Sequence, residues 1–249
     1  MLRRVSCFFA GGRRYSAAHT LPRHYWRIIP NKYELNMKKK RVIQALDSNK
    51  DDIIEVDKYK PYVVPGILAM NTMIYGLWQI PMFESFMYNH FTCSLAHLQT
   101  FKIYTLFTST FSHQSVLHLL CNNYGMFQLC PQILDKMTSI QFLKLYSSAG
   151  ICSFGTCIFL NQMLGLPDTL TLGASGALSA VVFILFNDES IRISFFHGQS
   201  TPIPGRLLLA LLVGLDLGLL LNADPNHGSF IAHGAHLGGF ALGAVYSIT

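Results

Sequence analysis

Charged residues are scarce in this sequence. Asp, Glu, Lys and Arg together make up 13% of the 249 residues, whereas hydrophobic residues make up 51%. A soluble globular domain carries about twice that share of charge. The mean hydropathy of +0.32 points the same way. This composition excludes an ordinary soluble domain and favours a protein that is largely embedded in a membrane.

Paired cysteines are also missing. The six cysteines form no CxxC pair, and most of them stand in apolar stretches, so they indicate neither a zinc site nor a disulfide framework. A metal enzyme built on His227, His233 and His236 is an alternative, but these histidines lack the i, i+4 spacing of a helical metal site. We therefore expect no metal and no cofactor.

Acidic residues are absent from the N-terminus as far as Glu34, whereas arginines recur through it. Residues 1–30 therefore have the composition of a mitochondrial transit peptide. A secretory signal is the alternative, but Arg13 and Arg14 interrupt the apolar run that it needs. More than half of the Lys and Arg residues lie at or before Arg41, so the formal charge of +6 belongs to this end and does not predict binding to nucleic acid.

A polar linker at residues 31–60 separates this leader from an apolar domain at 61–249. Within the domain, apolar segments recur at about 62–83, 111–132, 140–164, 174–187, 204–222 and 229–248. Because backbone groups in lipid must be satisfied without water, such segments predict an all-α, polytopic bundle of six transmembrane helices.

The segment at 174–187 is too short to span a bilayer. At the usual rise of an α-helix it is about 21 Å long, against a hydrocarbon core of about 30 Å. The preceding loop, 164–173, must then enter the membrane within a protein-lined or wet cavity. We therefore expect Ser175, in the first turn of this helix, to lie below the membrane surface.

Ser175 stands between Gly173 and Gly176 at this loop-to-helix junction. Free backbone N–H groups at the start of a helix can stabilise a developing negative charge, as a reaction with a serine nucleophile requires. Small residues such as Gly176 and Ala180 also mediate helix packing in membranes, which is the alternative interpretation. The soluble serine-hydrolase motif GxSxG does not fit, because its second glycine would fall on Ala177.

His236 stands near the start of the last apolar segment and is followed by glycines at 238, 239 and 243. This smooth helix face suits close packing against Gly176 and Ala180 of the short helix, which would bring the imidazole within hydrogen-bond reach of Ser175. A histidine near a helix end can be an interfacial anchor, but an ionisable residue in a membrane helix is a candidate for function. We interpret His236 as the base for Ser175.

His118 and Asn122 lie one helical turn apart in the segment FSHQSVLHLLCNNYG, which also contains His113. Their i, i+4 spacing places an imidazole and a carboxamide on one helix face, where both can donate hydrogen bonds toward a common point. Polar side chains also bridge helices in membranes, so this segment alone leaves both interpretations open.

Three motifs follow one another along the chain. They are HxxxN at His118 and Asn122, GxSG at Gly173, Ser175 and Gly176, and AHxxG at Ala235, His236 and Gly239. In this order they resemble the rhomboid family of intramembrane serine proteases. The resemblance covers about 61–246. It is greatest with the mitochondrial presenilin-associated rhomboid-like proteases, in the segments LWQIP, STFSH, LGASGA and AHLGG.

The resemblance implies a six-helix core in which Ser175 is the nucleophile and His236 its base, without an acidic third member. It also implies an oxyanion site formed by His118, Asn122 and the N–H of Ser175. The expected substrates are transmembrane proteins, and the expected location is the lipid of the mitochondrial inner membrane. The mitochondrial members usually carry an additional helix before the six, for which residues 31–60 are too polar.

Two other functions are compatible with the sequence. A catalytically inactive rhomboid-like protein would use the same polar residues to hold a client helix, and a transporter would use them as a permeation path. Inactive relatives usually lack the catalytic serine or histidine, whereas this chain has both. Asp216, midway along the apolar segment 204–222, fits a proton path better than it fits the expected protease. The alternative is a buried acid that is neutral or bonded to a neighbouring helix, and its role stays open.

Overall fold

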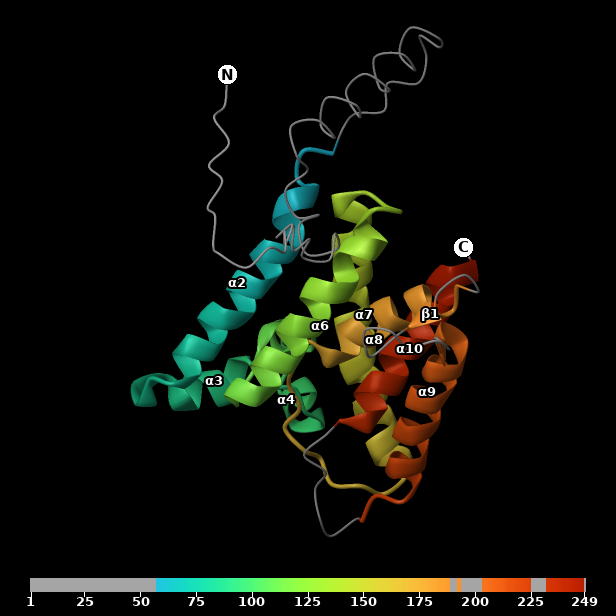
Figure 1. Ribbon diagram of the computed structural model, residues 1–249. Helices are drawn as coiled ribbons and strands as arrows, with labels where there is room; N and C mark the ends of the chain where they lie inside the picture. The colour runs from blue at the N-terminus through green and yellow to red at the C-terminus, as the bar shows by residue number, and fades with distance from the viewer. Residues whose placement is uncertain (1–56, 189–191, 194–202, 225–231, 249) are drawn as a thin grey trace, which may run out of the picture. The chain divides into compact units, whose positions relative to one another are not determined.

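The computed structural model describes residues 57–188, 192–193, 203–224 and 232–248. Six longer helices form the body of this part of the chain (Figure 1): α2 (Lys60–Trp78), α6 (Val116–Leu134), α7 (Ser139–Met163), α8 (Ser175–Phe186), α9 (Gly205–Leu221) and α10 (His233–Ile248). Each coincides with one of the apolar segments, so the expected all-α architecture is confirmed. The expected leader at 1–30 and nearly all of the expected linker at 31–60 lie outside the described residues.

The number of membrane spans stays a prediction. Among the described helices, α7 is the one that is long and apolar enough to cross a bilayer by itself. Helix α2 passes the same test together with η1 (Pro81–Phe83) and α3 (Glu84–His90), although the chain bends by 97° between them. Helix α8 is apolar but has 12 residues, about 18 Å of helix. It is therefore as short as the sequence predicted.

Hydrogen bonds from outside the helices explain where two of them begin. The Oγ of Ser115 accepts the N–H of His118 and so caps the start of α6, which places that start after the beginning of the apolar run at 111–132. At the start of α7, the N–H of Ser139 donates to the Asp57 carboxylate. This hydrogen bond lowers the pKa of Asp57, and a negative charge is favourable at a helix N-terminus.

Short helices fill the region between α2 and α6. After η1 and α3 come α4 (Leu95–Gln99), α5 (Thr105–Thr108) and η2 (Ser109–Phe111). They are tied to the loop that leads into α8, because Cys93 and Thr171 form an antiparallel bridge. The Asp168 carboxylate of that loop also accepts the N–H groups of Leu95 and Ala96, in the first turn of α4. These contacts fix the loop on one side.

A small pair of strands precedes α9. β1 (Arg192–Ile193) and β2 (Ile203–Pro204) pair antiparallel, with Arg192 opposite Pro204. Within the described ranges this is the whole of the sheet structure. It is too small to alter the helical class of the fold.

Helix α8 packs against α6, α7, α9 and α10, and its small residues Ala177 and Ala180 are fully buried. Glycines of α10 face it at close range. A Cβ at Gly239 would lie 2.0 Å from the carbonyl oxygen of Gly176, and a Cβ at Gly243 would lie 2.7 Å from the carbonyl oxygen of Ala180. The two backbones therefore touch, as the small-residue faces in the sequence predicted.

Candidate active site

Ser175 is the first residue of α8, so its N–H is one of those at a helix start that have no acceptor within the helix. The loop reaches the serine through Gly173, whose φ of +126° is a conformation that residues with a side chain rarely adopt. Space is also limiting, because a Cβ at Gly173 would lie 2.6 Å from the ring of His118. Both constraints explain the glycine at this position.

His236 lies beside the serine. Its Nε2 atom is 2.9 Å from the Oγ of Ser175, a normal distance for a hydrogen bond between nitrogen and oxygen. Gly176 directly follows Ser175, and Gly239 lies three residues after His236, so the backbone contact between these glycines, and with it the close packing of α8 on α10, sets the separation of the serine and the histidine. The structure thus brings together the two residues that the sequence paired. Their catalytic roles remain predictions.

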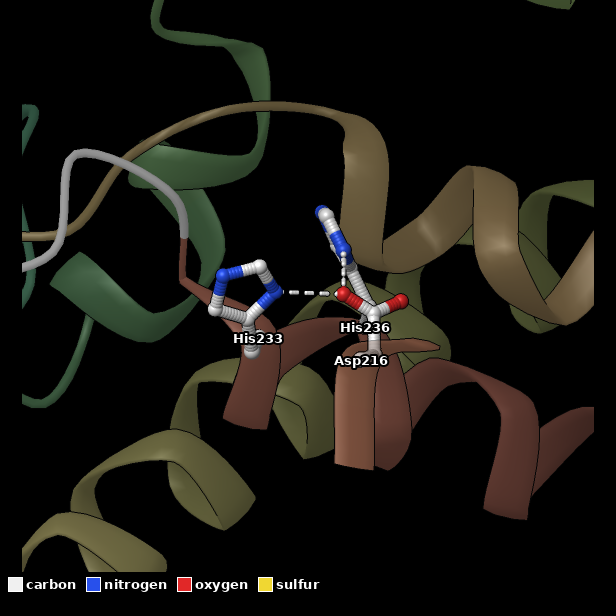
Figure 2. A group of neighbouring side chains, drawn as sticks. All are labelled: Asp216, His233 and His236. Carbon is white, nitrogen blue, oxygen red and sulfur yellow. Dashed lines mark hydrogen bonds and ion pairs between the residues drawn. The ribbon is translucent and has the colours of Figure 1, made fainter. Parts of the chain in front are cut away.

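A carboxylate continues this chain of hydrogen bonds behind His236 (Figure 2). The Oδ1 atom of Asp216, on α9, is 3.0 Å from the Nδ1 atom of His236 and 2.6 Å from the Nδ1 atom of His233. The rhomboid resemblance implied a serine–histidine pair with no acidic third member. In this chain a carboxylate contacts the histidine, and whether it takes part in catalysis stays a prediction.

These three side chains have limited access to solvent. The exposed fraction is 13% for the side chain of Asp216, 10% for His233 and 20% for His236. A carboxylate in such surroundings needs hydrogen-bond donors, and the two imidazoles supply them. The three ligand atoms lie within 4.8 Å of one another, a set that also suits a metal ion. Hydrogen bonds within the group already use these atoms.

The third group of predicted residues approaches the same loop from the start of α6. The ring of His118 packs against Gly173, and the Nε2 atom of His113 accepts the N–H of Ala174 at 3.4 Å. The buried amide of Asn122 donates to the carbonyl oxygen of His118 at 2.9 Å. An amide nitrogen carries two N–H groups, so one remains for a ligand. Within the described part of the chain, no hydrogen bond joins His118 or Asn122 to the serine.

Sequence reasoning missed some of the residues that shape this site. His233 was weighed only as a metal ligand beside His227, which lies outside the described residues. Its position three residues before His236 was the available signal, because residues at i and i+3 share a helix face. No pattern along the chain could connect Asp216 to α10 or Asp168 to α4, because these contacts join distant segments.

Comparison with known proteins identifies the family. The rhomboid domain family matches residues 100–249, which is more than half of the chain. The chain therefore belongs to the rhomboid family, whose fold is a helical bundle that passes through the membrane several times. The resemblance drawn from the three motifs is thereby confirmed at the level of the family.

Named relatives are mitochondrial rhomboid proteins. The presenilin-associated rhomboid-like protein A, mitochondrial, of Danio rerio is 30% identical over 208 residues, which are 82% of this chain and 51% of that relative. The human presenilin-associated rhomboid-like protein, mitochondrial, is 29% identical over 74% of this chain and 47% of its own length. Rhomboid protein 1, mitochondrial, of Saccharomyces cerevisiae is 28% identical over 74% of this chain and 52% of its own length. The chain spans about half the length of these relatives.

Proposed function

We propose that this chain is an intramembrane serine protease that cleaves peptide bonds in or near transmembrane segments of membrane proteins. The observation that carries the proposal is the row of hydrogen bonds from Ser175 through His236 to Asp216. A serine hydroxyl, an imidazole that can take its proton and a carboxylate that can orient the imidazole are thus in contact. Membership of the rhomboid family, whose members are usually such proteases, supports the same function.

In the proposed reaction, the Oγ of Ser175 attacks the scissile carbonyl carbon while its proton passes to the Nε2 of His236. The imidazole then donates this proton to the leaving amine. Water enters and attacks the acyl carbon while His236 removes a proton from it. The bond between the acyl carbon and Oγ then breaks, and the imidazole returns the proton to the Oγ of Ser175. An ionised carboxylate can only accept hydrogen bonds, so Asp216 holds the proton of neutral His236 on Nδ1. This tautomer leaves Nε2 free to accept the proton of the serine.

The negative oxygen of the tetrahedral intermediate needs donors that are already in place. The N–H of Ser175 lies at the start of α8, where a helix favours negative charge. His118 packs against the loop two residues before the serine, and Asn122 has one N–H beyond the one bonded to its own helix. We assign the oxyanion site to these three groups.

The alternative function as a transporter rested on Asp216. A carboxylate midway along an apolar helix suggested a proton path, but here it is bonded to two histidines, one of which contacts the serine. The protease accounts for this contact, because a carboxylate that orients a catalytic base is a recurrent arrangement. The same contact favours an active enzyme over an inactive client-binding relative, which would not need to orient the imidazole.

The names of the relatives support a mitochondrial membrane as the location. Together with the leader composition of residues 1–30, they lead us to propose the inner membrane, with membrane proteins of the same compartment as substrates. Because a helix satisfies its own carbonyl groups, a substrate helix must unwind locally before Ser175 can reach a peptide bond. Helix-breaking residues near the cleaved bond are the expected preference.

Substitution of the serine tests the proposed function. Purified protein reconstituted with single-span mitochondrial proteins should cleave at least one of them, and Ser175→Ala should abolish this cleavage without unfolding the protein. A serine-directed phosphonate should label the wild type and not the variant. Ser148→Ala is the matched control, because this serine of α7 donates to the carbonyl of Leu145 and should be dispensable. Cleavage by Ser175→Ala at the wild-type rate would falsify the proposal.

A further inference from the structure

His233 contacts the proposed catalytic group but takes no part in the reaction described above. Its Nδ1 atom lies 2.6 Å from the Oδ1 of Asp216, which is shorter than the 3.0 Å between the same oxygen and His236. The two imidazole rings are 6.3 Å apart and perpendicular. Figure 2 shows both rings converging on one carboxylate oxygen from different directions.

The two histidines are three residues apart at the start of α10, so they lie on the same face of that helix. Asp216 comes from α9 and reaches across to this face. A single hydrogen bond to His236 would leave the carboxylate able to turn about its side-chain torsions. A second bond to His233 fixes the same oxygen from another direction, and the carboxylate is then held at two points of one rigid helix.

Burial increases the contribution of this second hydrogen bond to holding the carboxylate in place. The side chains of Asp216 and His233 are 13% and 10% exposed, so water is poorly placed to replace a lost donor. Hydrogen bonds to charged groups stabilise a structure more than neutral ones do. Without His233, the carboxylate would turn toward another donor or toward water. Its bond to the Nδ1 of His236 would then be weakened.

We propose that His233 is a positioning residue for catalysis, which holds Asp216 in the orientation that keeps the proton of His236 on Nδ1. The inference rests on the proposed protease function. His233 touches neither the serine nor the reacting atoms, and it receives no proton in the reaction. It acts through Asp216 alone, so its contribution to turnover disappears when Asp216 can no longer act as a carboxylate.

A matched pair of substitutions tests this role. The amide nitrogen of Asn can take the place of the Nδ1 of histidine, whereas the longer side chain of Gln places its amide nearer the position of Nε2. His233→Asn should therefore keep most of the activity. His233→Gln should lower kcat by about 10- to 100-fold, the range for partners that orient a metal-binding histidine through a hydrogen bond. KM should change little in either variant, because the proposed role of His233 is exerted through Asp216 and not through contact with the substrate.

A double substitution separates positioning from folding. In an Asp216→Asn background, His233→Gln should slow labelling of Ser175 by a phosphonate no more than about twofold beyond the single Asp216→Asn variant. Equal effects of His233→Gln in both backgrounds would show a structural role and overturn the inference. So would equal kcat values for His233→Asn, His233→Gln and the wild type. If Ser175→Ala remains active, the protease proposal itself fails. If Ser175→Ala is inactive but the His233 variants have the kcat of the wild type, only the positioning role fails.

Discussion

Asp216 is an ionisable side chain on a helix that is otherwise apolar apart from Arg206 near its start. An unpaired carboxylate in such a helix is costly, whereas donors that replace water reduce the cost. Asp216 obtains both of its donors from α10. Removing one member of such a group leaves the others partly unsatisfied. Substitutions of Asp216, His233 and His236 should therefore have non-additive effects.

Replacing Asp216 by Asn should show how far the proposed base depends on its carboxylate. Asn has nearly the same shape, but its amide can donate to Nδ1 and so favour the tautomer with the proton on Nε2. Loss of the carboxylate in a serine–histidine–aspartate site lowers kcat by about 10⁴-fold. The rhomboid resemblance implies a serine–histidine pair that works without an acidic third member. We therefore expect a smaller loss of kcat, on the order of a hundredfold, when turnover of a reconstituted substrate is measured.

The control for this experiment is Asp168→Asn. Asp168 accepts two N–H groups at the start of α4 and has no contact with the histidines among the described residues. Asn can keep one of these two hydrogen bonds through its single carbonyl oxygen, and the lost bond does not involve the histidines, so this variant should keep most of the wild-type kcat. An Asp216→Asn enzyme as fast as the Asp168→Asn control would show that the contact with His236 is not used in catalysis.

Asn122 should contribute to turnover more than to substrate binding. Loss of one oxyanion donor lowers kcat by about 10²–10³-fold, so Asn122→Ala should lower kcat and leave KM nearly unchanged. Slow phosphonate labelling of Ser175 should persist, since the serine and its base are intact. Asn123 is the matched control, because its Oδ1 accepts from Asn71 on α2. Asn123→Ala should reduce thermal stability without a selective loss of kcat, and the same behaviour in Asn122→Ala would identify Asn122 as a helix-bridging amide.

The contact between α8 and α10 depends on glycine at position 239. A Cβ there would lie 2.0 Å from a backbone oxygen of Gly176, and backbone cannot move aside as a side chain can. Gly239→Ala should therefore separate the two helices and destabilise the protein by about 1–3 kcal/mol or more, the range typical of overpacking. Phosphonate labelling of Ser175 should fall as well. Gly218→Ala on α9 is the control, because a Cβ there meets nothing within 4 Å. If both variants show the same melting temperature in detergent, close backbone contact is not what joins α8 to α10.

The sequence predicted those elements whose signal is local. The long helices follow from apolar segments, and the approach of Ser175 to His236 follows from small residues at helical spacing on α8 and α10. The short helices α3, α4 and α5 were not predicted, because they contain too few turns to show an apolar period, and η1 was expected to belong to the helix at 62–83. The role of Asp216 stayed open for a different reason. The hydrogen-bond partners of Asp216 depend on which helix lies beside α9, and a single sequence does not show which helices are neighbours.

We expect the membrane location of the chain to depend on residues 1–30, which lie outside the described residues. An apolar helical domain without an import signal would be inserted into other cellular membranes, because hydrophobic segments alone direct insertion without selecting mitochondria. Residues 1–30 have the Arg-rich, acid-free composition that mitochondrial import requires. Import should therefore depend on the charge of this leader rather than on the domain.

Changing Arg3, Arg4, Arg13 and Arg14 to Gln keeps the length of the leader and removes much of its charge. With a C-terminal tag, the variant should shift from mitochondria to other membranes in fractionated cells, because import machinery recognises positive charge on an amphipathic leader. The control changes the basic cluster Lys38–Arg41 in the linker to Gln and should leave the protein in mitochondria. If the leader variant still fractionates with mitochondria, the targeting information lies elsewhere in the chain and the transit-peptide interpretation of 1–30 is wrong. Loss of targeting in the linker variant alone would assign that information to residues 31–60.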